Sequence, residues 1–232
     1  MQISVAAKSF SLVPFCARGC LLLAVFILLF CDGAHDQLGL TVRAAVGGET
    51  VVVLRHGEKP SEGLGQLTCT GLNRALQLPA VLIGRFGRAS AIFAPNPAMQ
   101  VTEGPASLPY SYVRPLATIE PTAIQLGLPV NTQMAFSDVA GLEHAVTAPP
   151  YSNSTVFIAW EHKYAYKFAQ QLLSDFGQDS SAVPVWNSDD FDMMYVFRIT
   201  QNLSENKGRA NVTFEAQHEG LTASLPSSCP SK

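Results

Sequence analysis

Short apolar runs alternate along this chain with segments whose apolar residues recur at helical spacing. The clearest strand is predicted over 51–54, where four apolar and mostly β-branched residues stand in a row. Residues 155–160 form the most hydrophobic internal segment and predict a second buried strand. Further strands are predicted at 92–94, 129–131, 194–199 and 211–216.

Helices are predicted between these strands. Thr70 is expected to cap the first of them, over 71–86, and Pro79 is expected to bend or shorten it. Residues 95–109 hold four prolines and a glycine, and we predict that they form a loop. The apolar face of the first helix is predicted to hold Leu72, Ala75, Leu76, Ile83 and Phe86. The other predicted helices span 114–126, 138–146 and 164–176.

Strands that alternate with helices predict the fold class. We expect an α/β protein, a three-layer α/β/α sandwich with a mostly parallel central sheet. At 232 residues the chain is long enough for one substantial core, and nothing demands a second domain. We therefore predict a single domain over 50–232, preceded by a linker over 34–49.

The N-terminus carries an apolar segment of its own. Residues 20–31 are uncharged and apolar and follow the basic residues Lys8 and Arg18. Their length is that of a signal-peptide core, whereas a membrane-spanning helix needs about 20 apolar residues. We predict that 1–33 is a secretory signal, with an uncleaved membrane anchor as the alternative, so that the protein is secreted or exported through the secretory pathway.

Sequons and cysteines agree with export. The asparagines at Asn153, Asn202 and Asn211 each stand in the Asn-x-Ser/Thr pattern of N-glycosylation, which predicts a glycoprotein. Three of the five cysteines fall in the predicted leader, which leaves Cys69 and Cys229. In an oxidising compartment we expect these two to form a disulfide that ties the C-terminal tail to the first helix, and two free thiols are the alternative.

Composition and charge exclude one class of function. The chain is 47% apolar and 14% charged, with a net charge of −3. It has no cluster of lysine and arginine that would neutralise a nucleic-acid backbone, so no nucleic-acid partner is expected. A single phosphate held by two or three local cations is compatible with this composition.

Arg55, His56 and Gly57 directly follow the first predicted strand. In open α/β sheets ligands gather at the carboxyl ends of the strands, where these residues would lie. The glycine lets the chain turn and pack close to a ligand. A histidine beside a guanidinium fork at this edge is suited to attack a phosphoryl group while the arginine holds the phosphoryl oxygens.

This Arg-His-Gly run resembles the signature of the histidine phosphatase superfamily, the phosphoglycerate-mutase-like enzymes. The resemblance covers roughly residues 50 to 200 and implies a catalytic domain of this type without a metal or other cofactor. The segment before Arg114 is longer than the family's usual spacing. Further pieces of the family pattern follow in order: Leu67-Thr68, Gly71, Arg74-Ala75, Ile92-Phe93-Ala94 with Asn96-Pro97, Arg114 with Thr118, and a strand that leads to His162.

The resemblance implies a phosphomonoester hydrolase. His56 would form a phosphohistidine that water later hydrolyses, while Arg55, Arg114 and His162 would bind the phosphoryl group. The expected partner is a small phosphorylated substrate, and a membrane is expected only through an uncleaved N-terminal anchor. The alternatives are a catalytically silent phospholigand-binding member of the same fold and a phosphoglycerate-mutase-type phosphotransferase. A metallohydrolase is disfavoured because the chain lacks close His-x-His or His-x-x-x-His spacing.

The proton donor for the leaving alcohol stays open at this point. Glu161 ranks first because it adjoins His162, and Glu143, Asp138 and Glu58 are the other candidates. Because neighbours on an extended chain point to opposite faces, Glu161 reaches the pocket only if the strand ends before it. Asp138 is equally well explained as a helix cap, and the other two as solvated charges.

Overall fold

The computed structural model describes residues 48–201 and 210–231, which belong to a compact unit formed by Ala44–Lys232. The predicted signal segment, most of the predicted linker, the sequon at Asn202 and the three leader cysteines lie outside the described residues. Within the described ranges no helix is long and apolar enough to cross a membrane.

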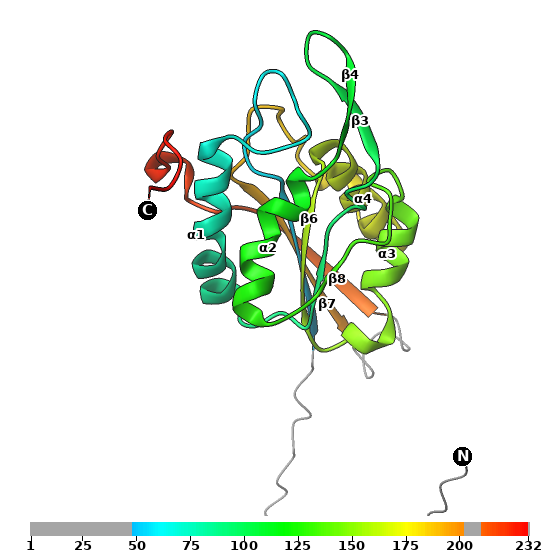
Figure 1. Ribbon diagram of the computed structural model, residues 1–232. Helices are drawn as coiled ribbons and strands as arrows, with labels where there is room; N and C mark the ends of the chain where they lie inside the picture. The colour runs from blue at the N-terminus through cyan, green and yellow to red at the C-terminus, as the bar shows by residue number, and fades with distance from the viewer. Residues whose placement is uncertain (1–47, 202–209, 232) are drawn as a thin grey trace, which may run out of the picture. The chain divides into compact units, whose positions relative to one another are not determined.

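A six-stranded sheet forms the centre of the unit, in the order β5-β2-β6-β1-β7-β8 (Figure 1). The strands β5, β2, β6 and β1 run parallel to one another, and β7 is antiparallel to both β1 and β8. The predicted mostly parallel sheet is therefore confirmed. The strands are β1 (Gly48–Arg55), β2 (Ala91–Phe93), β5 (Val130–Asn131), β6 (Thr155–Trp160), β7 (Met193–Gln201) and β8 (Ala210–His218).

Helices cover both faces of this sheet, which confirms the three-layer arrangement (Figure 1). Because side chains alternate along β1, Val51 and Val53 pack in the core cluster that includes Phe168 of α4, while Val52 and Leu54 pack in the cluster under α1 and α2. The helices are α1 (Cys69–Phe86) and α2 (Arg114–Leu126) on one face, and α3 (Val139–Val146) and α4 (His162–Asp175) on the other. Three short 3-10 helices are η1 (Pro149–Tyr151), η2 (Ser180–Ala182) and η3 (Thr222–Ser224).

The predicted loop over 95–109 is wrong, because much of this segment is a β-hairpin. Its strands β3 (Gln100–Glu103) and β4 (Leu108–Ser111) pair antiparallel with each other. Proline is tolerated here because each strand of a two-stranded sheet keeps one open edge that needs no ladder hydrogen bond. The hairpin projects beyond the sheet at the top of Figure 1.

Two helices begin earlier than predicted because the capping residue differs. The cap of α1 is Thr68 instead of Thr70, and its side-chain oxygen accepts a hydrogen bond from the Gly71 N–H at 3.1 Å. Helix α4 begins at His162 because the Glu161 carboxylate caps it. Pro79 does not shorten α1, which continues past it to Phe86.

The predicted bond between Cys69 and Cys229 is present and joins the start of α1 to the C-terminal tail. Asn73 supports the same junction, because its side-chain amide donates to the carbonyl oxygens of Pro226 and Ser228 at 2.9 and 2.8 Å. The tail is thus fastened to α1 by a covalent bond and by hydrogen bonds.

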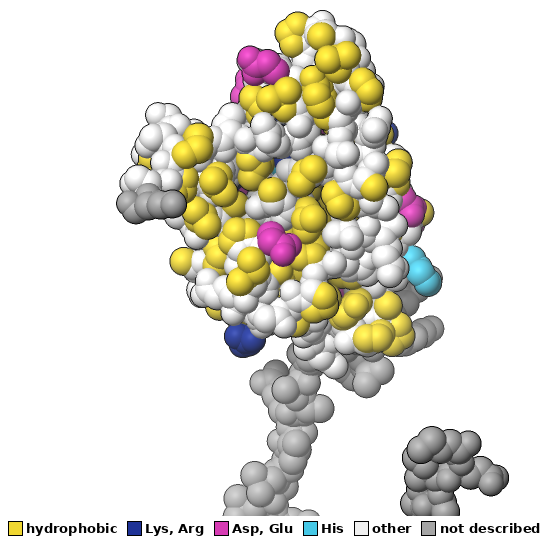
Figure 2. Space-filling view, in the orientation of Figure 1, with side chains coloured by type: hydrophobic (Ala, Val, Ile, Leu, Met, Phe, Trp, Pro, Cys, Tyr) yellow, Lys and Arg dark blue, Asp and Glu magenta, His cyan; other side chains and the backbone are white. Residues whose placement is uncertain are grey.

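The outer face of α1 and α2 carries exposed apolar side chains (Figure 2). Leu72 and Leu76 were predicted on the buried face of α1, yet they are 38% and 52% exposed. The buried face of α1 includes Arg74, Ala75 and Leu78 instead. A polar residue therefore takes a core position, and this shifts the buried stripe around the helix.

Candidate active site

The neighbouring strands β1 and β6 end at the same edge of the sheet. Arg55, the last residue of β1, lies opposite Trp160, the last residue of β6. The His56 N–H donates to the Trp160 carbonyl at 3.1 Å, so the chain leaves both strands at the same level. Glu161 and His162 follow directly. Strand β6 ends before Glu161, which is the condition under which Glu161 was expected to reach the pocket.

All five residues predicted for the site line one cavity of about 390 Å³. They come from three places: the end of β1, the start of α2, and the junction of β6 with α4. The predicted site residues on its wall are Arg55, His56, Arg114, Glu161 and His162. Other lining residues, which sequence reasoning did not assign to the site, include Lys59, Glu103, Tyr112, Phe136, Lys163 and Tyr164.

His56 is 2% exposed, and its ring is held by the backbone of the next residue. The Nδ1 atom lies 2.8 Å from the Gly57 carbonyl oxygen. A carbonyl oxygen only accepts, so Nδ1 carries the proton and Nε2 keeps its lone pair. Burial, together with the nearby charge of Arg114, holds the pKa of His56 well below its usual value. The imidazole is therefore neutral near pH 7 and has a free nucleophilic nitrogen.

Gly57 fits a place where two helices converge. A Cβ atom there would stand 2.9 Å from the Gly71 carbonyl oxygen of α1, which is too close for any larger residue. Its N–H donates to the Thr118 hydroxyl oxygen of α2 at 2.9 Å, and that hydroxyl donates to the Arg114 carbonyl at 2.8 Å. These contacts fix the carbonyl that holds the His56 ring.

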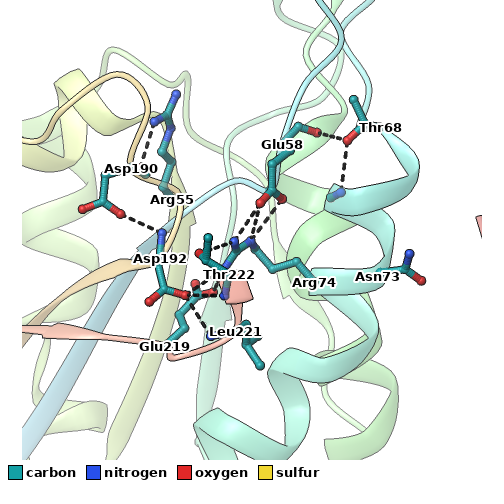
Figure 3. A network of polar contacts seen from close by, with 12 residues as sticks. Arg55, Glu58, Thr68, Asn73, Arg74, Asp190, Asp192, Glu219, Leu221 and Thr222 are labelled. Atoms are coloured by element: carbon teal, nitrogen blue, oxygen red, sulfur yellow. Dashed lines mark hydrogen bonds and ion pairs between the residues drawn. The ribbon is translucent and has the colours of Figure 1, made fainter. Parts of the chain in front are cut away.

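Arg55 is held by the segment that precedes β7. Its Nη1 atom donates to the carbonyl oxygens of Asn187, Ser188 and Asp190 at 3.3, 2.7 and 2.9 Å. Its guanidinium also stacks over Phe191, 3.8 Å from the ring centroid. Burial lowers the pKa of Arg55 to about 10, so the group stays charged near pH 7. Figure 3 shows Arg55 beside Asp190.

Arg114 is paired with a carboxylate that the sequence did not point to. Its Nη1 atom donates to Oε2 of Glu103 at 2.7 Å, and its Nη2 atom donates to Oε1 of the same residue. Lys59 Nζ lies 3.3 Å from Glu103 Oε1. Burial raises the pKa of Glu103, but the hydrogen bonds and charges of Arg114 and Lys59 outweigh burial, and the net shift is downward. The Glu103 carboxylate is ionised and covers the fork of Arg114.

Glu161 is bound to the start of α4. Its Oε2 atom accepts the backbone N–H groups of Lys163 and Tyr164 at 2.9 and 3.2 Å. Its Oε1 atom lies 2.8 Å from His162 Nδ1. Burial raises the pKa of Glu161, but the bond to His162 and these N–H groups outweigh burial and lower it. Glu161 is thus an ionised cap that orients the His162 ring.

The other three candidate proton donors do not line the cavity. Asp138 caps α3 and accepts the Gly141 N–H at 2.9 Å. Glu143 is buried on α3, and this burial, with the charge of Asp175, raises its pKa to about 7. Glu58 is held outside the cavity by its ion pair with a buried arginine.

That arginine, Arg74, is the centre of a polar network (Figure 3). Its side chain is fully buried and contacts Glu58 at 2.7 Å, Asp192 at 3.3 Å, and Glu219. It also donates to the Thr222 hydroxyl at 3.0 Å. The network joins the loop after β1 to α1 and to the C-terminal segment, and the helical spacing of apolar residues did not indicate it.

Aromatic rings line the side of the cavity next to His56. The Tyr112 ring meets the His56 ring edge-on at 6.0 Å, and Phe136 and Tyr164 continue the row at 5.3 and 5.5 Å between successive rings. The Trp160 indole N–H donates to the Phe136 carbonyl at 2.8 Å and supports this row from behind. The cavity therefore combines a cationic end with an aromatic wall.

No family model and no curated protein sequence matches this chain. Similar solved structures include a protein assigned as the phosphohistidine phosphatase SixA of Nakamurella multipartitia, at 18% identity and a TM-score of 0.49, over 74% of this chain and 96% of that one. A mycobacterial glucosyl-3-phosphoglycerate phosphatase in complex with inorganic phosphate is 11% identical, with a TM-score of 0.48 over 72% and 95%. Phosphoglycerate mutase of Plasmodium falciparum is 9% identical, with a TM-score of 0.44 over 72% and 89%. These proteins belong to the superfamily that the Arg-His-Gly motif resembles.

Proposed function

We propose that the protein is a metal-independent phosphomonoester hydrolase that acts through a phosphohistidine on His56. The observation that carries this proposal is the bond from His56 Nδ1 to the Gly57 carbonyl, which leaves Nε2 unprotonated in a cavity that two guanidinium groups also line. A neutral imidazole with a fixed tautomer is a competent nucleophile, and it needs no base to activate it.

The cations of the cavity suit the charge of a phosphoryl group. Arg55, Arg114 and His162 would bind its oxygens, and positive charge around those oxygens is what phosphoryl transfer chiefly requires. Nε2 of His56 would bond to phosphorus as the bond to the leaving oxygen breaks. Water would then attack phosphorus, break the bond to Nε2 and release inorganic phosphate.

We propose a small phosphorylated substrate, in keeping with a cavity of about 390 Å³. Tyr112, Phe136 and Tyr164 would contact its organic part, because aromatic faces bind apolar and aromatic groups. We also propose that the protein is exported, which the Cys69–Cys229 bond supports because such bonds persist in oxidising compartments.

Hydrolysis of 4-nitrophenyl phosphate by the full-length chain, with EDTA present, tests this function. We expect turnover that His56→Ala lowers by roughly 10³-fold or more, because the nucleophile is lost. His144→Ala is the control, since His144 is an exposed histidine of α3 outside the cavity. Mass spectrometry of the chain during turnover, in conditions that preserve the acid-sensitive phosphohistidine, should find one phosphoryl group, bound at His56.

Other outcomes would point to the competing functions. Turnover that EDTA abolishes would contradict the proposal and indicate a metallohydrolase. A folded protein that binds inorganic phosphate but hydrolyses no phosphomonoester would be a silent phospholigand-binding protein. Phosphoryl transfer from the chain to an added alcohol in preference to water would indicate a phosphotransferase.

A further inference from the structure

The leaving oxygen needs a proton, and two carboxylates line the described part of the cavity, Glu103 and Glu161. The partners of Glu161 are His162 and two N–H groups at the start of its own helix. These partners stay in place whatever binds in the cavity, and they favour the ionised form throughout. Glu161 is therefore a poor proton donor.

Glu103, in contrast, is paired with a residue that the substrate itself would bind. Both of its carboxylate oxygens lie on the two Nη atoms of Arg114, and one of them also lies 3.3 Å from Lys59 Nζ. A phosphoryl group that binds the fork of Arg114 has to displace this carboxylate. The displaced carboxylate loses a cation and gains an anion as its neighbour, and both changes favour its protonated form.

The backbone around Glu103 is docked too closely for the residue to leave the cavity. A Cβ on Gly63 would stand 2.4 Å from the Glu103 Cβ, and a Cβ on Gly104 would stand 2.2 Å from the Glu62 carbonyl oxygen. Both glycines have positive φ, at +83° and +71°, so the loop before α1 and the hairpin fit together only with glycine at these positions. The displaced side chain therefore stays beside the bound phosphoryl group.

We infer that Glu103 of the β3–β4 hairpin is the proton donor to the leaving oxygen, a conclusion that rests on the proposed function. Substrate displaces the Glu103 carboxylate from Arg114, and the carboxylate takes up a proton. As His56 Nε2 bonds to phosphorus, the electron pair of the breaking P–O bond goes to the leaving oxygen, which takes that proton. Glu103 then accepts a proton from the water that hydrolyses the phosphohistidine. When inorganic phosphate leaves Arg114, Glu103 releases this proton and its carboxylate pairs with Arg114 again, which restores the starting state.

Leaving-group dependence tests this role. The full-length protein and Glu103→Gln are compared on 4-nitrophenyl phosphate, whose leaving group departs without a proton, and on phenyl phosphate, whose leaving group is a stronger base. We expect Glu103→Gln to lower kcat/KM for phenyl phosphate by about 10²-fold to 10⁴-fold, and to change it far less for 4-nitrophenyl phosphate. Glu62→Gln, an exposed carboxylate beside the hairpin, is the matched control and should leave both values unchanged.

The outcomes separate the two proposals. If Glu103→Gln lowers kcat/KM equally on both substrates, Glu103 only positions Arg114. If Glu103→Gln raises kcat/KM on both substrates, Glu103 only blocks Arg114. Either result would overturn the inference. Glu103→Asp, which keeps the acid on a shorter side chain, should fall between the original protein and Glu103→Gln on phenyl phosphate. If the unaltered protein shows no His56-dependent turnover of 4-nitrophenyl phosphate, the proposed function itself fails, and the role of Glu103 fails with it.

Discussion

At the scale of single residues, Thr118 connects the parts of the site that lie on different elements. Its hydroxyl accepts the N–H of Gly57 and donates to the carbonyl of Arg114. It is fully buried, so neither partner has water as a substitute. One hydroxyl thereby fixes the residue that orients the His56 ring relative to the helix that starts with Arg114.

Thr118→Val keeps the shape of the side chain but removes the acceptor for the Gly57 N–H. We expect the free energy of unfolding to fall by about 1–3 kcal/mol, because a buried donor is left unpaired. We expect kcat/KM for 4-nitrophenyl phosphate to fall roughly 10-fold to 100-fold as the His56 ring loses its support. Urea unfolding and steady-state kinetics measure the two effects. Thr118→Ser, which keeps the hydroxyl, should retain most of the activity; equal losses in both variants would contradict this role.

At the scale of elements, the closely packed loop between β1 and α1 positions the hairpin that carries Glu103. Gly63 has a φ of +83°, and a Cβ there would stand 2.4 Å from the Glu103 Cβ. Gly87, which ends α1, has a similar φ of +76°, but a Cβ on Gly87 would meet nothing within 4 Å. A side chain at either glycine would therefore strain the backbone to a similar extent, but only a side chain at Gly63 would also collide with another residue, Glu103.

Gly63→Ala should therefore destabilise the protein more than Gly87→Ala. Both substitutions cost about 1–2 kcal/mol for an alanine at positive φ. We expect Gly63→Ala to lower the free energy of unfolding by about 1–3 kcal/mol beyond that, because the added methyl group overlaps Glu103. Urea unfolding of the two variants gives the difference, and equal losses would show that the hairpin moves aside without cost.

The sequence indicated most of the elements and most of the site. The candidate site residues of β1 and β6 were predictable because both strands have apolar centres and run parallel, and because His56 or His162 stands within two positions of the end of each strand. The hairpin was not predictable from four prolines, since pairing between β3 and β4 depends on contacts across a turn. The contact between Glu103 and Arg114 is a consequence of that pairing. Arg74 was missed as a core residue because a buried guanidinium depends on carboxylates far away in the chain, such as Glu219.

At the scale of the whole molecule, two buried carboxylates make stability depend on pH. Burial raises the pKa of Glu49, which is 3% exposed, to about 8. Burial also raises the pKa of Glu219 to about 8. The negative charges of Asp192 and Glu58 add to this shift, and Arg74 opposes it. Between pH 4.5 and about pH 8 the folded protein holds protons that the unfolded chain has released. Its stability therefore falls as the pH rises through this window.

Glu49→Gln should remove part of this dependence. The free energy of unfolding of the unaltered protein should fall between pH 5 and pH 8, and the variant should fall less steeply, by up to about 1.4 kcal/mol per pH unit. Urea unfolding at several pH values measures both slopes. Glu120→Gln, an exposed carboxylate of α2, should keep the slope of the unaltered protein. Parallel slopes for Glu49→Gln and the unaltered protein would show that Glu49 is ionised when folded.

The Arg74 network also sets the order in which this protein can be completed. Glu58, in the loop that follows β1, depends on Arg74, and Arg74 in turn contacts Glu219 and Thr222 near the end of the chain. Those residues follow Arg74 by 145 and 148 positions, and the bond that locks the same segment to α1 joins cysteines 160 positions apart. The loop that follows β1 therefore gains its contacts through Arg74 only after Glu219 and Thr222 have been synthesised, so a chain cut before these residues lacks them.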